Sequence, residues 1–181
     1  MHPTFRFIRS QGDLDGACFL YALLNARQTL TGKRATANSW SAAVRILTTP
    51  ECFIDNTRGS EGTDGDHEKE RDLAERFINH LAPAAPLRVQ TAKGLKSGIL
   101  GAARPTESSV IVCSNNQHWF SILDADEDRV YVACSWVWQR DPQKYTERVS
   151  PGFERVYNDI VTIGDLEFYK SRALIVSTSE A

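Results

Sequence analysis

Cys18 and His118 are the two residues of this sequence whose types could carry out covalent chemistry together. Cys18 lies where the polar segment 12–17 gives way to an apolar run, so it is expected in the first turn of a helix. The unpaired N–H groups and the dipole of a helix N-terminus lower the pKa of a thiol and favour the reactive thiolate. A histidine can supply the base or imidazolium partner that such a nucleophile needs. The alternative for Cys18 is a buried thiol that packs as a small hydrophobe.

His118 is the histidine best placed for this role among the four in the chain. It opens an expected strand directly after the polar residues 114–117, so a sheet would hold its backbone while its side chain faces a cleft. His2 lies near the start of the chain, and His67 and His80 belong to polar or amphipathic segments typical of solvated histidines. A cysteine on a helix and a histidine on a strand, far apart in sequence, are the arrangement that cysteine proteases require.

The segment around Cys18 resembles the first active-site block of papain-like cysteine peptidases. That family carries a motif of the form Q-G-x-C-G-x-C-W. This chain has Gln11 and a glycine, then Gly-Ala-Cys-Phe at 16–19, with one extra residue between the two parts. By this resemblance Cys18 is the nucleophile. Gln11 would be the side chain that stabilises the tetrahedral oxyanion, together with the backbone N–H of Cys18.

A second segment resembles the histidine and asparagine strands of the same family. There a histidine is followed by a strand, a turn, a strand and then Asn-Ser-Trp, whereas here His118 leads to Cys134, Ser135 and Trp136. The step from 118 to 134 matches the family's step from histidine to asparagine. By the resemblance, Trp136 shields the imidazole from water. Cys134 is a poor acceptor for an imidazole N–H, so the third catalytic member is absent or is supplied by Ser135 or another residue.

Two other families of cysteine peptidase share parts of this pattern. Residues 15–22, Asp-Gly-Ala-Cys-Phe-Leu-Tyr-Ala, are similar to the D-G-x-C-x-x-x-A block of OTU-type deubiquitinases, which would give Asp15 a role in shaping the oxyanion site. Those enzymes place an acid two residues after the histidine, where this chain has Phe120. Bacteriocin-processing peptidases of export transporters share the glutamine, cysteine and histidine, with an aspartate near the position of Cys134.

These resemblances imply a cysteine peptidase that hydrolyses a protein or peptide substrate through a thiolate–imidazolium pair of Cys18 and His118, with no metal or organic cofactor. The same residues also serve thiol amidases, deamidases, transglutaminases and acyltransferases. A non-catalytic module that only binds protein is the alternative outside the enzymes. The compact chain also resembles bacterial effector and toxin peptidase domains, which specialised secretion systems deliver into a target cell and cognate immunity proteins inhibit.

The two blocks must be positioned by a chain that is helical in its first half and rich in strands in its second. Helices are expected over 17–30, 38–47, 66–81 and 165–171. Strands are expected over 87–91, 109–114, 118–124, 129–136, 156–163 and 173–178, with a hairpin at the acidic link 124–128. Helices followed by a mostly antiparallel sheet indicate an α+β fold. The resemblance makes it papain-like, with a helical part at about 10–100, a sheet part at about 105–181 and the active-site cleft between them.

Length and composition indicate a single globular domain over 1–181, with 41% apolar and 24% charged residues and a formal net charge of −2. This charge argues against a nucleic-acid partner. No apolar run could span a membrane, and residues 1–13 lack the features of a secretory signal peptide, which favours a cytoplasmic protein or specialised delivery. The four cysteines lack the spacing of a zinc site, so reduced thiols are expected.

Two further expectations concern the surroundings of His118. Trp119, Trp136 and Trp138 are expected to gather around it, as core packing or as a wall against water. The polar, acidic segment 55–66 is expected to form a long surface loop, with a lid over the cleft as the alternative.

Overall fold

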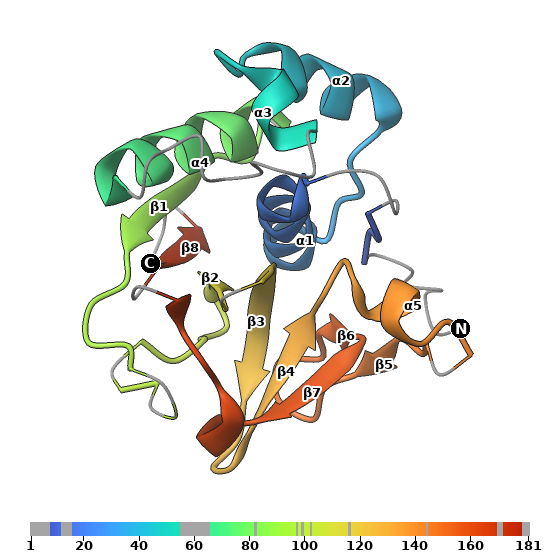
Figure 1. The fold of residues 1–181 in the computed structure, drawn as a ribbon, viewed down its shortest axis with the longest axis vertical. Coiled ribbons are helices and arrows are strands. Elements are labelled where there is room, and N and C mark those ends of the chain that lie inside the picture. The colour runs from blue at the N-terminus through green and yellow to red at the C-terminus, as the bar shows by residue number, and fades with distance from the viewer. Residues whose placement is uncertain are drawn as a thin grey trace.

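A six-stranded sheet in the order β1-β8-β2-β3-β4-β7 forms the centre of the molecule, and all of its neighbouring strands pair antiparallel (Figure 1). The computed structural model describes residues 8–11, 16–54, 66–81, 83–96, 98, 100–101, 103–115, 117–143, 145–169 and 172–178. The strands of the large sheet are β1 (Leu87–Thr91), β2 (Ser109–Ser114), β3 (Trp119–Ala125), β4 (Arg129–Ala133), β7 (Asp159–Thr162) and β8 (Ala173–Thr178). A separate two-stranded ribbon pairs β5 (Arg148–Val149) with β6 (Val156–Tyr157). The expected α+β class and the mostly antiparallel sheet are confirmed.

The helices are α1 (Cys18–Thr31), α2 (Ala37–Arg45), α3 (Pro50–Ile54), α4 (His67–Leu81) and α5 (Val137–Arg140). Figure 1 shows α1 between the strands and the layer formed by α2, α3 and α4. The buried apolar side chains form two cores on opposite faces of the sheet, since successive side chains of a strand point to opposite sides. On β3, Trp119 and Leu123 face α1, whereas Phe120 and Ile122 face the other core.

Helix α1 is buried on nearly all sides, as its apolar spacing predicts. It ends where the sequence predicts, because Gly32 adopts a left-handed conformation with φ 62° and donates its N–H to the carbonyl of Gln28. The Asn25 side chain accepts the N–H of Arg9 at 2.8 Å and donates to the carbonyl of Arg9 at 3.2 Å. This pair of hydrogen bonds fixes the segment 8–11 against the helix.

The first turn of α1 packs against the first residues of β3. The rings of Phe19 and Trp119 meet edge to face with centroids 4.6 Å apart, and the Ser121 hydroxyl donates to the carbonyl of Ala22 at 2.7 Å. Helix α1 and strand β3 therefore run in the same direction. Their N-terminal ends, which carry the two residues singled out by the sequence, lie at the same end of the sheet.

One prediction for the C-terminal third is confirmed in part and another is wrong. The strand expected over 156–163 is present as β6 and β7 but is interrupted at Asn158, whose side chain bonds to the backbone of Cys134. No α-helix forms among the described residues of 165–171: a 3₁₀ turn at Ile163–Asp165 precedes Leu166, whose backbone is extended, and Tyr169 is again in a 3₁₀ conformation. Leu166, which is 2% exposed, is buried there in the second core, and its carbonyl accepts the N–H of Gly98.

Two other regions also differ from expectation. Helix α3 forms where the sequence predicts no helix, and Pro50 opens it at a position where its missing N–H costs no helical hydrogen bond. Helix α5 follows the turn at 134–136, so β4 ends before the expected residue 136. The hairpin of β3 and β4 is confirmed, with Asp126 accepting the N–H groups of Asp128 and Arg129 in its turn.

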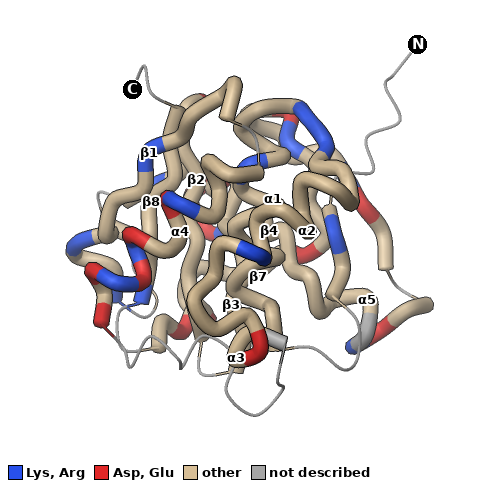
Figure 2. Tube along the Cα trace, turned by 90° about the horizontal axis from the view of Figure 1, so that it is seen from above, with Lys and Arg blue, Asp and Glu red and all other residues tan. Residues whose placement is uncertain are grey.

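Charged residues of both signs interleave along the chain in Figure 2, in keeping with the small net charge. In the described part of the chain, no helix is long and apolar enough to cross a membrane.

A buried ion pair joins the helical layer to the sheet. Glu70 of α4 pairs with Arg172, which directly precedes β8, and their side chains are 1% and 5% exposed. The Arg172 guanidinium also lies 5.6 Å from the ring centroid of Trp119. Because both charges are removed from water, each depends on the other for compensation.

We expect Glu70→Ala to lower the free energy of unfolding by about 3–5 kcal/mol, because it leaves the Arg172 charge buried without its carboxylate. Urea denaturation followed by circular dichroism measures the change. Lys69→Ala is the matched control: it removes an exposed pair with Asp66 and should cost no more than about 1 kcal/mol. Equal effects of the two substitutions would contradict the role assigned to the buried pair.

Candidate active site

The segment that carries Gln11 lies beside the turn at 134–136, which connects β4 to α5 (Figure 1). The N–H of Gln11 donates to the carbonyl of Ser135 at 3.2 Å. In return the Ser135 hydroxyl donates to Oε1 of Gln11 at 2.9 Å. Gln11 and Ser135 are thus joined through both backbone and side chain, although they lie far apart in sequence.

Ser135 also contacts the histidine. Its Oγ lies 3.4 Å from Nε2 of His118, and the two residues are 1% and 6% exposed. A hydroxyl has one hydrogen, and that of Ser135 is committed to Gln11, so its oxygen acts as acceptor toward the Nε2–H of His118. This arrangement selects the tautomer of His118 in which Nδ1 carries the lone pair.

Asn115 fixes the backbone at His118. Its Oδ1 accepts the N–H groups of Gln117 at 3.0 Å and His118 at 2.7 Å, and its own N–H donates to the carbonyl of His118 at 3.0 Å. The loop between β2 and β3 is therefore a turn closed by an asparagine side chain. The histidine enters β3 from a fixed position rather than from a loose loop.

Asn158 fixes the turn that carries Ser135. Its Oδ1 accepts the N–H of Cys134 at 2.8 Å, and its Nδ2 donates to the carbonyl of Cys134 at 2.7 Å. Burial raises the pKa of the Cys134 thiol to about 11, so this thiol stays neutral near pH 7. Of the two residues weighed as third member, Ser135 is the one that hydrogen-bonds to His118, whereas Cys134 is a packed thiol whose backbone is held by Asn158.

One of the three tryptophans expected around His118 packs against its ring. The centroids of His118 and Trp136 are 5.7 Å apart, with the planes tilted by 37°. Trp119 points to the other face of the sheet and packs on Phe19, and Trp138 of α5 is 46% exposed. The expected cluster is wrong for these two because strand alternation and the helical turn of α5 direct them away.

Cys18 lies at the end of the sheet that also carries His118, because α1 and β3 both begin there. It is the first residue of α1 and is half-buried, as expected for a thiol at a helix N-terminus. Its neighbour Phe19 packs on Trp119, the neighbour of His118. The contacts above directly join four of the residues that the sequence singled out: Gln11, Ser135, His118 and Trp136. Asp15 lies outside the described residues, as do residues 55–65 of the expected acidic loop.

Burial and a neighbouring cation set the charge of the histidine. Loss of hydration and then the positive charge of Arg140 lower the pKa of His118 from 6.5 to about 4. Arg140 is held by an ion pair with Asp159 at 2.6 Å and lies over Trp136 at 5.9 Å. With this pKa the imidazole is neutral near pH 7, which makes it a proton acceptor rather than the standing imidazolium that the sequence suggested.

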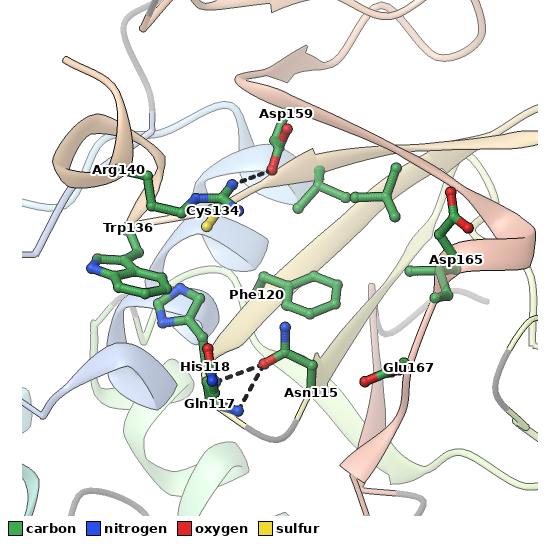
Figure 3. A pocket seen from close by; sticks show the side chains of 13 residues that line it. Asn115, Gln117, His118, Phe120, Cys134, Trp136, Arg140, Asp159, Asp165 and Glu167 are labelled. Atoms are coloured by element: carbon green, nitrogen blue, oxygen red, sulfur yellow. Dashed lines mark hydrogen bonds and ion pairs between the residues drawn. The ribbon is translucent and has the colours of Figure 1, made fainter.

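Figure 3 shows a pocket on the sheet face opposite α1, with the His118 ring at its edge between Trp136 and Phe120. The pocket has a volume of about 200 Å³. The side chains that line it come from the loop before β3, the strands β3, β4 and β7, the turn and helix after β4, and the segment 165–167.

No family model, curated protein or solved structure matches this chain.

The sequence did not single out Asn115, Asn158 or Arg140. An asparagine three residues before a histidine, in a polar turn, is a signal for the side-chain hydrogen bond that Asn115 makes. Asn158 lies inside an apparent strand, and its contact with the turn at 134–136 depends on how β4 and β7 pair. Arg140 carries no local signal.

Arg140→Gln should raise the pKa of His118 above about 4 yet leave it below 6.5, because burial is the larger cause of the shift and remains. The NMR shifts of the imidazole protons against pH measure this value. A histidine with a lowered pKa in the folded state stabilises the fold fully above pH 6.5, and the contribution is lost as the pH falls toward 4. The acid loss of stability should therefore be smaller in Arg140→Gln.

Arg148→Gln, which removes an exposed arginine from β5, is the control for this charge change and should leave the pKa of His118 unaltered. A pKa above 6.5 in the unsubstituted protein would contradict a neutral imidazole. It would point instead to an anion beside the ring, as in a standing thiolate–imidazolium pair.

Proposed function

We propose that this protein is a cysteine peptidase of papain-like architecture, in which Cys18 is the nucleophile and His118 moves the protons. The observation that carries the proposal is the series of contacts from His118 through Ser135 to Gln11, at the end of the sheet where the helix that starts with Cys18 begins. The α+β fold, with helices packed on an antiparallel sheet, is compatible with that architecture.

The tautomer of His118 assigns the proton transfers. Since Nε2–H points to Ser135, Nδ1 is the atom that takes the proton of the Cys18 thiol. The sulfur forms a bond to the substrate carbonyl carbon, and the carbonyl oxygen becomes an oxyanion. When the tetrahedral intermediate collapses, the C–N bond breaks and Nδ1–H protonates the departing nitrogen. A water molecule, activated by the neutral His118, then hydrolyses the thioester.

Gln11 and the helix N-terminus serve the oxyanion. Because Oε1 of Gln11 accepts from Ser135, the orientation of the amide is set and its NH₂ group is on the side away from the serine. That NH₂ and the backbone N–H of Cys18 are the two donors proposed for the oxyanion. Loss of one such donor typically costs about a hundredfold to a thousandfold in kcat.

Ser135 takes the orienting role that an asparagine has in the papain-like pattern. It is a positioning residue, because it acts through His118 and Gln11 rather than on the substrate. A contact of 3.4 Å is long for a hydrogen bond, so the packing of Trp136 against the imidazole contributes to holding the ring.

Alkylation by iodoacetamide tests the nucleophile. At pH 6–7 we expect Cys18 to react roughly tenfold faster than Cys52, because His118 accepts its proton and the helix N-terminus stabilises the thiolate. Cys52 of α3 is also half-buried and is an internal control in the same protein. His118→Ala should remove most of this advantage without changing the rate at Cys52. Mass spectrometry of the labelled peptides gives both rates, and equal rates in the unsubstituted protein would refute the proposal.

The reaction type is tested by identifying new protein N-termini in cells that express the protein, with Cys18→Ala as the control. A peptidase produces N-termini that depend on Cys18. Conversion of substrate glutamine to glutamate, or acyl transfer to lysine, without new N-termini would replace the peptidase by a deamidase or an acyltransferase that uses the same residues.

A further inference from the structure

The pocket beside His118 has no role in the chemical steps proposed above (Figure 3). Its volume of about 200 Å³ is smaller than that of sites for drug-sized ligands and suits a single amino-acid side chain. Apolar side chains from three strands and from the following segment form its walls: Phe120, Val132, Val161 and Leu166. Walls of this kind accept the methylene groups of a long side chain.

The rim of the pocket carries unbalanced negative charge. Asp165 and Glu167 are both exposed and line the pocket, and neither forms an ion pair within the described part of the chain. The other carboxylate that lines it, Asp159, is neutralised by Arg140 at 2.6 Å. A neutral imidazole at His118 adds no compensating charge. The rim therefore favours a cation over an anion.

The position of His118 relates the pocket to the reaction. In the proposed mechanism Gln11 holds the acyl oxygen, and His118 protonates the nitrogen that departs. His118 and Trp136 are at the edge of the pocket, whereas Gln11 and Cys18 do not line it. The pocket therefore lies next to the part of the substrate that leaves with the nitrogen, and not next to the acyl part.

We propose that this pocket binds a cationic side chain, that of arginine or lysine, in the leaving part of the substrate. The inference rests on the proposed function. The methylene stem lies against Phe120 and Leu166, and the charged end lies at the rim with Asp165 and Glu167. The amide side chains of Asn115 and Gln117, in the loop before β3, line the same pocket and contribute hydrogen-bonding capacity, and that of Gln117 is exposed.

Binding to the Cys18→Ala protein tests the inference without any need for catalysis. Argininamide is the amine that would be released if arginine followed the cleaved bond, and citrullinamide is its neutral counterpart with nearly the same shape. We expect argininamide to bind about fivefold tighter at low salt, in the range of one partly exposed ion pair. Chemical shifts of the Asn115 and Gln117 amides and of the Trp136 indole report the binding and locate it.

Asp165→Asn combined with Glu167→Gln should bring the affinities of the two ligands together. Glu51→Gln, which neutralises an exposed carboxylate on α3, should leave their difference intact. Equal affinities in the starting protein, a preference that survives the double substitution, or shifts centred on Gly32 and Phe153 at another recess would each overturn the inference. A reactive Cys18 without this preference would refute the pocket assignment alone, and the preference with an unreactive Cys18 would refute the peptidase alone.

Discussion

The hydroxyl of Ser135 is the contact on which the candidate site depends. This one hydroxyl sets the tautomer of His118, the orientation of the Gln11 amide and the distance between the segments that carry them. The turn that holds Ser135 is itself fixed by Asn158, which satisfies both backbone groups of Cys134. A buried polar network of this kind is costly when it is incomplete, so its members are mutually dependent. This dependence ties the extended segment 8–11, the end of β4 and the start of β3 into one unit.

Burial of His118 has a cost that also shapes its chemistry. The lowered pKa means that protonation of His118 is roughly 3 kcal/mol less favourable in the folded protein than in water. In the proposed mechanism, a charged pair of Cys18 and His118 forms during the reaction and not before it, which is the condition for a catalytic effect rather than for tight ground-state binding. Arg140 opposes the imidazolium, and its ion pair with Asp159 moderates that opposition.

The regular elements were largely predictable because local rules determine them. Apolar spacing and Gly32 gave the bounds of α1 to within a residue, and β2 and β8 coincide with their β-branched runs. The errors occur where a distant partner overrides the local signal. Asn158 lies in a run of residues typical of a strand, but its side chain forms hydrogen bonds to the backbone of Cys134, and the strand is interrupted there. Leu166 lies in a stretch with helical composition, but the second core and the N–H of Gly98 hold it extended.

The candidate site was predictable in its residue types and not in its contacts. Gln11, Cys18 and His118 follow from two short blocks, but the choice between Cys134 and Ser135 depends on which of two adjacent side chains points at the imidazole. The turn that follows β4 decides that choice, because the two side chains leave it in different directions. Cys134 packs into the second core, and Ser135 turns toward the segment of Gln11. In the proposed papain-like pattern, an oriented histidine therefore does not require an asparagine at the position of Cys134, because Ser135, one residue further along the chain, contacts the imidazole.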